Sequence, residues 1–338
     1  MSRNGLLDLL GASRPALSAQ QGVLMQLNLA SVSIEANTPQ DQLYREAVMA
    51  ARLLRETALA SRQWPLAIVA SPSTWEFIQA QPVSHGLWDL HVPFNVTHSR
   101  EVLETERART VGNAPASYAV RIERDMAHWV WKVATFLLSP FHETLYMDTD
   151  ILVLSSRFIS DLLERSLRIA DLVSPVDPNR PGRQIVTSRT RKYHINPPMY
   201  GRGVPPLCMG LTAYRSTPAV VRLFERAAIR LMSRWSVEDP QDHSKLIRQG
   251  DQEMVWMELM YGPVDRELRV FTLPEEYYCP MIALRGSVRQ RASAPHWTTS
   301  WTKGDRSREY PCHAIHGHYS ARKLLIANLS HLMPPPRA

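Results

Sequence analysis

The chain has 338 residues, 44% of them hydrophobic and 21% charged, which excludes a disordered, collagen-like or coiled-coil protein and indicates a globular one with a large core. The formal net charge of +7 suits an anionic partner, such as a nucleotide diphosphate, a nucleic acid or an anionic membrane surface. The three cysteines are too few and too scattered for a disulfide framework or a zinc site.

Strand-like and helix-like segments alternate between two tails, at residues 1–20 and 331–338. In chain order we predict a strand at Val23–Ala30, a helix after Thr38, strands at Leu66–Ala70 and Leu87–Val92, a helix at Arg124–Ser139, strands at Thr144–Met147, Ile151–Leu154 and Leu207–Tyr214, a helix from Thr217 to about Trp235, a helix at 250–261 and a strand at Arg269–Leu273. Such alternation is typical of an α/β domain.

Three segments add to this outline. Thr38-Pro39-Gln40-Asp41 has the composition of a helix start, and Pro140 should end the helix before it. Asp177–Gly203 is rich in basic residues, proline and glycine without periodicity, which predicts a long loop at or over the active site.

No segment approaches the run of about 18 apolar residues that a membrane span needs. The leucine-rich N-terminus is interrupted by Asp8, and its apolar run is too short for a signal peptide. We therefore expect a cytoplasmic protein, or a Golgi or secretory one if an anchor lies outside this sequence.

Two acidic residues, Asp148 and Asp150, lie between the apolar segments Leu145–Met147 and Ile151–Leu154. Residues two apart on an extended chain point to the same side, so both carboxylates could share one cation. Mg²⁺ and Mn²⁺ prefer such oxygen ligands and keep positions open for phosphate oxygens. The alternative is a solvated turn, which the apolar flanks disfavour because burying acids without a partner is costly.

The block Trp131–Phe141, followed by Thr144–Asp150, resembles the core of GT-A glycosyltransferases, most closely the glycogenin-like and nucleotide-diphospho-sugar transferase families. A weaker resemblance extends from Gly22 to Lys323. The resemblance as a whole implies one GT-A (Rossmann-like) α/β domain at residues 21–330, with a mixed, mostly parallel central sheet flanked by helices. Residues 21–155 would bind the nucleotide sugar, and residues 156–330 would form an extended acceptor side.

The resemblance also implies roles for single residues. Asp148 and Asp150 would bind Mn²⁺ or Mg²⁺, with Asp148 also near the donor ribose. Lys132 would contact the donor sugar or its diphosphate, unless it is a solvated cation on an exposed helix face. The mouth of the first strand, including Asn28 and Ala30, would line the nucleotide base pocket.

Further donor contacts come from two later segments. In Cys208-Met209-Gly210 only Gly210 matches the family's sugar-binding triplet, and a glycine there would let the backbone approach a ligand or would simply serve the core. Asp251 and Gln252 resemble the family's catalytic pair. Asp251 would bond to donor-sugar hydroxyls and Gln252 would lie over the anomeric carbon, although Asp251 is also a suitable acid for a helix N-terminus.

Three histidines lie close together near the C-terminus. The resemblance implies that His316 is a third metal ligand, with His318 as second choice, and that Lys323 or Arg322 contacts the diphosphate. The alternative is that these histidines have only a structural role.

These observations predict an enzyme that transfers a sugar from a UDP- or GDP-sugar to an acceptor hydroxyl on a glycan, a protein or a small molecule. A sugar nucleotidyltransferase is an alternative, but Ser31–Thr38 lacks the expected glycine- and arginine-rich phosphate loop. A catalytically silent nucleotide- or sugar-binding protein is another. Nucleic acid is not an expected partner, because the basic loop has few interleaved aromatic residues.

Overall fold

The structure is a computed structural model that describes residues 38–57, 64–94, most of 129–175 and 207–263, and 267–273. It also describes parts of the segment between residues 7 and 29 and short strands between residues 278 and 316. The predicted basic loop Asp177–Gly203, together with Ala30, His318, Arg322 and Lys323, lies outside these residues.

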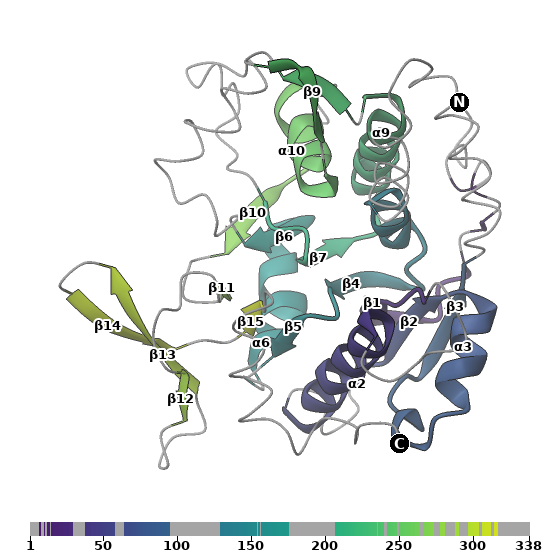
Figure 1. Cartoon of the computed structure of the whole chain (residues 1–338), viewed down its shortest axis with the longest axis vertical. Helices are drawn as coiled ribbons and strands as arrows, with labels where there is room; N and C mark the ends of the chain where they lie inside the picture. Colours follow the sequence, from purple (N-terminus) through teal and green to yellow (C-terminus); the bar gives the residue numbers. More distant parts are fainter. Residues whose placement is uncertain are drawn as a thin grey trace.

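The largest sheet has the strand order β10-β6-β7-β4-β1-β2-β3 (Figure 1). Strand β7 is antiparallel to its neighbours β4 and β6, and the other pairs are parallel. The predicted α/β fold with a mixed, mostly parallel sheet is therefore confirmed. The strands are β1 (Ala19–Gln26), β2 (Leu66–Ala70), β3 (Leu90–Pro93), β4 (Phe141–Met147), β6 (Leu172–Pro175), β7 (Leu211–Arg215) and β10 (Val270–Leu273).

Helices cover both faces of this sheet. Alternate strand residues point to opposite faces, so each face has its own buried side chains. Val23 and Met25 belong to one buried cluster and Leu24 to the other. The first cluster includes α2 (Pro39–Thr57), α3 (Pro72–Gln79) and the consecutive helical segments α6 (Arg157–Ser160), η2 (Asp161–Ser166, a π-helix) and α7 (Leu167–Ile169). The second includes the helix at 129–137, α9 (Pro218–Arg234) and α10 (Asp251–Tyr261), and Figure 1 shows α9 and α10 on the opposite side of the strands from α2. None of the described helices is long and apolar enough to cross a membrane.

Smaller sheets complete the described part. Strand β5 (Ile151–Val153) lies antiparallel to β15 (Ala314–His316), which pairs with β11 (Tyr278–Pro280). The register sets His316 opposite Ile151, so the C-terminal strand returns to the segment that follows the two aspartates. The other strands are the hairpin β8 (Ser236–Asp239) and β9 (Asp242–Arg248), and the set β12 (Val288–Gln290), β13 (Trp297–Lys303) and β14 (Arg306–Pro311).

Several predicted boundaries differ from the structure. The first strand starts at Ala19, and Leu7 and Leu10 of the predicted tail are buried in the second cluster. Residues 208–210 form a turn before β7, so the strand predicted to start at Leu207 is shorter. Strand β6 and helix α3 were not predicted. In α3 Ser71 is the N-cap, and its hydroxyl accepts from the backbone N–H of Thr74.

The close approach of β1 and the Phe141 ring gives a stability prediction. A Cβ at Gly22 would lie 2.5 Å from atoms of that fully buried ring. We expect Gly22→Ala to lower the free energy of unfolding by about 1–3 kcal/mol through overpacking, as measured by urea denaturation. Adding Phe141→Leu should recover part of this loss, because it shortens the opposing side chain. Strictly additive costs of the two substitutions would contradict the steric explanation.

Candidate active site

The acidic pair follows β4 at the carboxyl edge of the sheet. Strand β1 leads to β2 and β3 on one side, while β4 pairs with β1 on the other. The strand order therefore reverses between β1 and β4, and in open α/β sheets ligands bind at the carboxyl ends of the strands beside such a switch point. Asp148 follows β4 and Asn28 follows β1, so each lies just beyond one of these two strands.

The backbone at the acidic pair is a turn and not the extended chain that was predicted. Thr149 and Asp150 are turn residues, and the Ile151 N–H donates to the Asp148 carbonyl at 3.1 Å. The alternation argument for two carboxylates on one side is therefore wrong. Asp148 itself still follows the β4 alternation, and both carboxylates belong to partly exposed residues.

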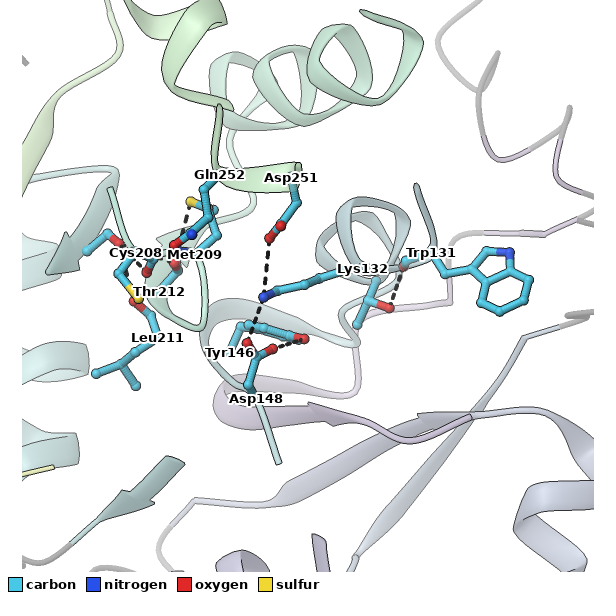
Figure 2. A network of polar contacts seen from close by, with 12 residues as sticks. Trp131, Lys132, Tyr146, Asp148, Cys208, Met209, Leu211, Thr212, Asp251 and Gln252 are labelled. Atoms are coloured by element: carbon cyan, nitrogen blue, oxygen red, sulfur yellow. Dashed lines mark hydrogen bonds and ion pairs between the residues drawn. The ribbon is translucent and has the colours of Figure 1, made fainter. Parts of the chain in front are cut away.

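Lys132 joins two segments of the site. It lies on the helix at 129–137, and its Nζ is 2.6 Å from Asp148 Oδ2 and 3.2 Å from Asp251 Oδ2 (Figure 2). Lys132 is only 8% exposed, so the alternative of a solvated helix face is excluded. Burial acts to lower the pKa of Lys132, but the nearby charges of Asp148 and Asp251 outweigh it and hold the pKa above its ordinary value. The site thus contains a charged ammonium between two carboxylates.

Tyr146 is a site residue that the sequence analysis missed. Its hydroxyl donates to Asp148 Oδ1 at 2.7 Å, and its ring is buried. Burial, together with the charge of Asp148, raises the pKa of Tyr146 well above its ordinary value, so the phenol stays protonated as a donor. The signal was present in the sequence, because Tyr146 lies two residues before Asp148 on the predicted extended chain, where residues two apart share a face.

Gly210 leaves room for the Asp148 carboxylate. A Cβ at position 210 would lie 2.8 Å from Asp148 Oδ2, and the Gly210 carbonyl accepts the Asp148 N–H at 2.7 Å. The close backbone approach that was predicted at Gly210 is therefore found, and in this structure its partner is Asp148.

Helix α10 supplies the other predicted pair. Asp251 is its first residue and is 6% exposed, and Gln252 Oε1 accepts the Met209 N–H at 3.1 Å (Figure 2). The helix is tied to α9 by the buried Glu258, whose carboxylate accepts from Arg226 Nε at 3.0 Å and from Arg230 Nε. The structure thus brings Lys132, Asp148, Gly210, Asp251 and Gln252 together, from segments far apart in the sequence.

Two of the predicted metal ligands have the chemistry that a divalent cation prefers. Asp148 and Asp150 offer hard carboxylate oxygens, which Mg²⁺ and Mn²⁺ prefer, and the missing side chain at Gly210 keeps space beside Asp148. The β5–β15 register brings the backbone of His316 next to the residue that follows Asp150. Among the side chains that the structure describes, no three from His, Cys, Asp and Glu gather as a metal site, and the His316 side chain is not one of them.

Asn28, the predicted nucleotide contact after β1, has an unusual environment. Both its amide nitrogen and its amide oxygen are buried and have no hydrogen-bond partner in the described part of the chain. Buried polar groups normally have partners, because leaving one unpaired costs about 1–3 kcal/mol. Asn28 thus carries a side-chain donor and acceptor beyond β1 that none of the described residues satisfies.

No family model and no curated protein matches the sequence. Among solved structures, the chain is similar in fold to WbbM, a bifunctional glycosyltransferase, with 12% identity and a TM-score of 0.48 over 80% of this chain and 41% of WbbM. It is also similar to the galactosyltransferase LgtC, with 11% identity and a TM-score of 0.47 over 92% and 94% of the two chains. Mouse xyloside xylosyltransferase 1 gives 15% identity and a TM-score of 0.46 over 78% and 87%. All three of these proteins are glycosyltransferases.

Proposed function

We propose that this protein is a metal-dependent glycosyltransferase that moves a sugar from a nucleotide-diphosphate sugar, with UDP or GDP as the nucleotide, to an acceptor hydroxyl. The observation that carries the proposal is the buried Lys132 ammonium held between Asp148 and Asp251 beside the switch point of the sheet. Burying Lys132 and Asp251 with their charges is costly, so such a cluster beside the partly exposed Asp148 favours a functional role over a stabilising one.

The residues suit the charges of this reaction. In the transfer, the bond between the anomeric carbon and the diphosphate oxygen breaks, and the acceptor oxygen bonds to that carbon. The acceptor proton passes to the released nucleoside diphosphate or to solvent. Mn²⁺ or Mg²⁺ held by Asp148, Asp150 and His316 would neutralise charge that builds on the leaving diphosphate.

The protein's own groups would bind and orient the donor. Asp251 accepts hydrogen bonds, so it can hold donor-sugar hydroxyls at the start of α10. Gln252 would use its amide near the anomeric carbon, and Asn28, whose amide is paired by none of the described residues, would contact the nucleotide base. Lys132 supplies positive charge that does not depend on the metal. Positioning of this kind accounts for a large share of catalysis in transfer reactions.

A donor panel tests the proposal. Purified protein would be incubated with UDP- and GDP-sugars and Mn²⁺, and nucleotide release would be compared between wild type, wild type with a chelator and Asp150→Ala. We expect release by the metal-loaded wild type alone. Equal release by Asp150→Ala would contradict the metal role, whereas donor binding without release would indicate a silent binding protein.

A further inference from the structure

Asp148 is held at both carboxylate oxygens and at its backbone N–H. Its Oδ1 accepts from the Tyr146 hydroxyl at 2.7 Å, its Oδ2 accepts from Lys132 at 2.6 Å, and its backbone N–H donates to Gly210. One hydrogen bond on each oxygen fixes the carboxylate plane. Since each carboxylate oxygen can accept two hydrogen bonds, each keeps one lone pair for another ligand.

The two hydrogen-bond donors to Asp148 differ in kind. Lys132 is a long, flexible cation that is shared with Asp251. Tyr146 is a neutral donor on a rigid aromatic side chain of β4. Its ring is 1% exposed and packs against Phe136 with a ring-centroid distance of 4.5 Å. The phenol therefore holds Oδ1 at a position that the core determines, while Lys132 divides its contacts between Asp148 and Asp251.

We propose that Tyr146 is the positioning residue that fixes Asp148 for binding of the divalent cation and its diphosphate. This inference rests on the proposed function. Groups that hydrogen-bond to a metal ligand orient it, and losing one typically weakens metal binding or activity by about 10- to 100-fold. Without the phenol, the Asp148 carboxylate would rotate about the single Lys132 contact, and its free lone pair would no longer have a set direction.

A purely structural role for the hydroxyl is the competing explanation, because buried tyrosines usually find a partner. The chain offers a matched control in Tyr214 on the neighbouring strand β7. Its ring is also 1% exposed and also packs on Phe136, at 5.6 Å. Its hydroxyl donates to the Phe136 carbonyl, again at 2.7 Å. Tyr214→Phe therefore removes a hydrogen bond of equal length from the same aromatic cluster without touching a carboxylate of the site.

The experiment compares wild type, Tyr146→Phe and Tyr214→Phe as full-length proteins. Mn²⁺ binding would be measured from the electron paramagnetic resonance signal of free Mn²⁺ with UDP or GDP present. Nucleotide release would be followed as a function of Mn²⁺ concentration, and thermal unfolding would be recorded without metal. We expect Tyr146→Phe to bind Mn²⁺ about tenfold more weakly and to need correspondingly more Mn²⁺ for half-maximal release. Its kcat at saturating Mn²⁺ should stay close to that of wild type, and Tyr214→Phe should match wild type in Mn²⁺ binding.

The outcomes test the positioning role of Tyr146 and the proposed function separately. If wild type binds Mn²⁺ and Tyr146→Phe binds it equally well, the positioning role is overturned while the proposed function stands. Equal weakening in both variants would also overturn it, because the effect would then belong to the aromatic cluster. Absence of Mn²⁺ binding in wild type would overturn both the positioning role and the proposed function.

Discussion

Lys132→Met is expected to lower the free energy of unfolding by about 3–5 kcal/mol, because removing one partner of a buried ion pair leaves the other charge uncompensated. Asp251 is the more buried partner, with a side chain 8% exposed, and Asp148 the less buried, at 24%. The loss would be measured by urea denaturation without metal. Arg168→Met, which removes an exposed cation from α7, is the control and should change stability little.

The pH dependence of this difference follows from the raised pKa of Lys132. A group whose pKa is higher in the folded state contributes stability below its unfolded pKa and loses it as the pH rises through the folded value. The ion-pair contribution should therefore be constant from neutral pH to pH values below the ordinary lysine pKa. A stability difference that vanishes between neutral and mildly alkaline pH would contradict a charged Lys132.

Mn²⁺ should partly replace the lost ammonium in Lys132→Met. A divalent cation beside Asp148 restores positive charge, and a ligand that binds only the folded state raises its stability. The rise in melting temperature on adding Mn²⁺ should thus be larger for Lys132→Met than for wild type. Nucleotide release should nevertheless stay strongly reduced, because a cation held by Asp148 and Asp150 would not replace the contact of Lys132 with Asp251.

Asp251→Asn is expected to reduce kcat for nucleotide release by about 100-fold, as misplacing the donor does in other enzymes, while the protein stays folded. The substitution keeps the size of the side chain but removes the charge that holds Lys132 and the acceptor that would orient donor hydroxyls. Steady-state kinetics at saturating donor and Mn²⁺ would measure kcat, and the melting temperature would show whether the variant is folded.

Glu258→Gln provides the control within α10. Glu258 is also buried and bonded to basic residues, but its partners Arg226 and Arg230 lie on α9 and are not among the residues assigned to the donor. It should destabilise the protein more than Asp251→Asn does, yet keep kcat near that of wild type. If both variants lost activity in proportion to their lost stability, Asp251 would have only a structural role.

The elements that the sequence predicts well have local causes. The N-cap Thr38 is confirmed, since its hydroxyl accepts the Asp41 N–H at 3.3 Å, and the apolar run Leu66–Ala70 is a fully buried strand. Strand β6 was not predicted because Leu172–Pro175 is short and lacks a turn signal of its own. The antiparallel direction of β7 depends on contacts with two other strands and has no local signature.

In the candidate site, too, some features have a local sequence signal and others depend on tertiary packing. The resemblance of residues 131–150 indicated Lys132 and Asp148, and a second segment indicated Asp251. Their contact depends on the packing of α10 over the sheet, which no local pattern encodes. The turn at Asp148–Ile151 was predicted as extended chain because apolar residues flank it on both sides. The hydrogen bond from Tyr146 to Asp148 could have been predicted from the two-residue periodicity of an extended chain.

Titration of the full-length protein with Mn²⁺ in the presence of UDP or GDP, with free Mn²⁺ followed by electron paramagnetic resonance, tests the central claim most directly. Saturable binding by wild type that is lost in Asp148→Asn and in Asp150→Ala, with both variants folded, is the result expected if these two aspartates hold the cation. Undiminished Mn²⁺ binding by these variants, or none by wild type even with the nucleotide, would contradict it.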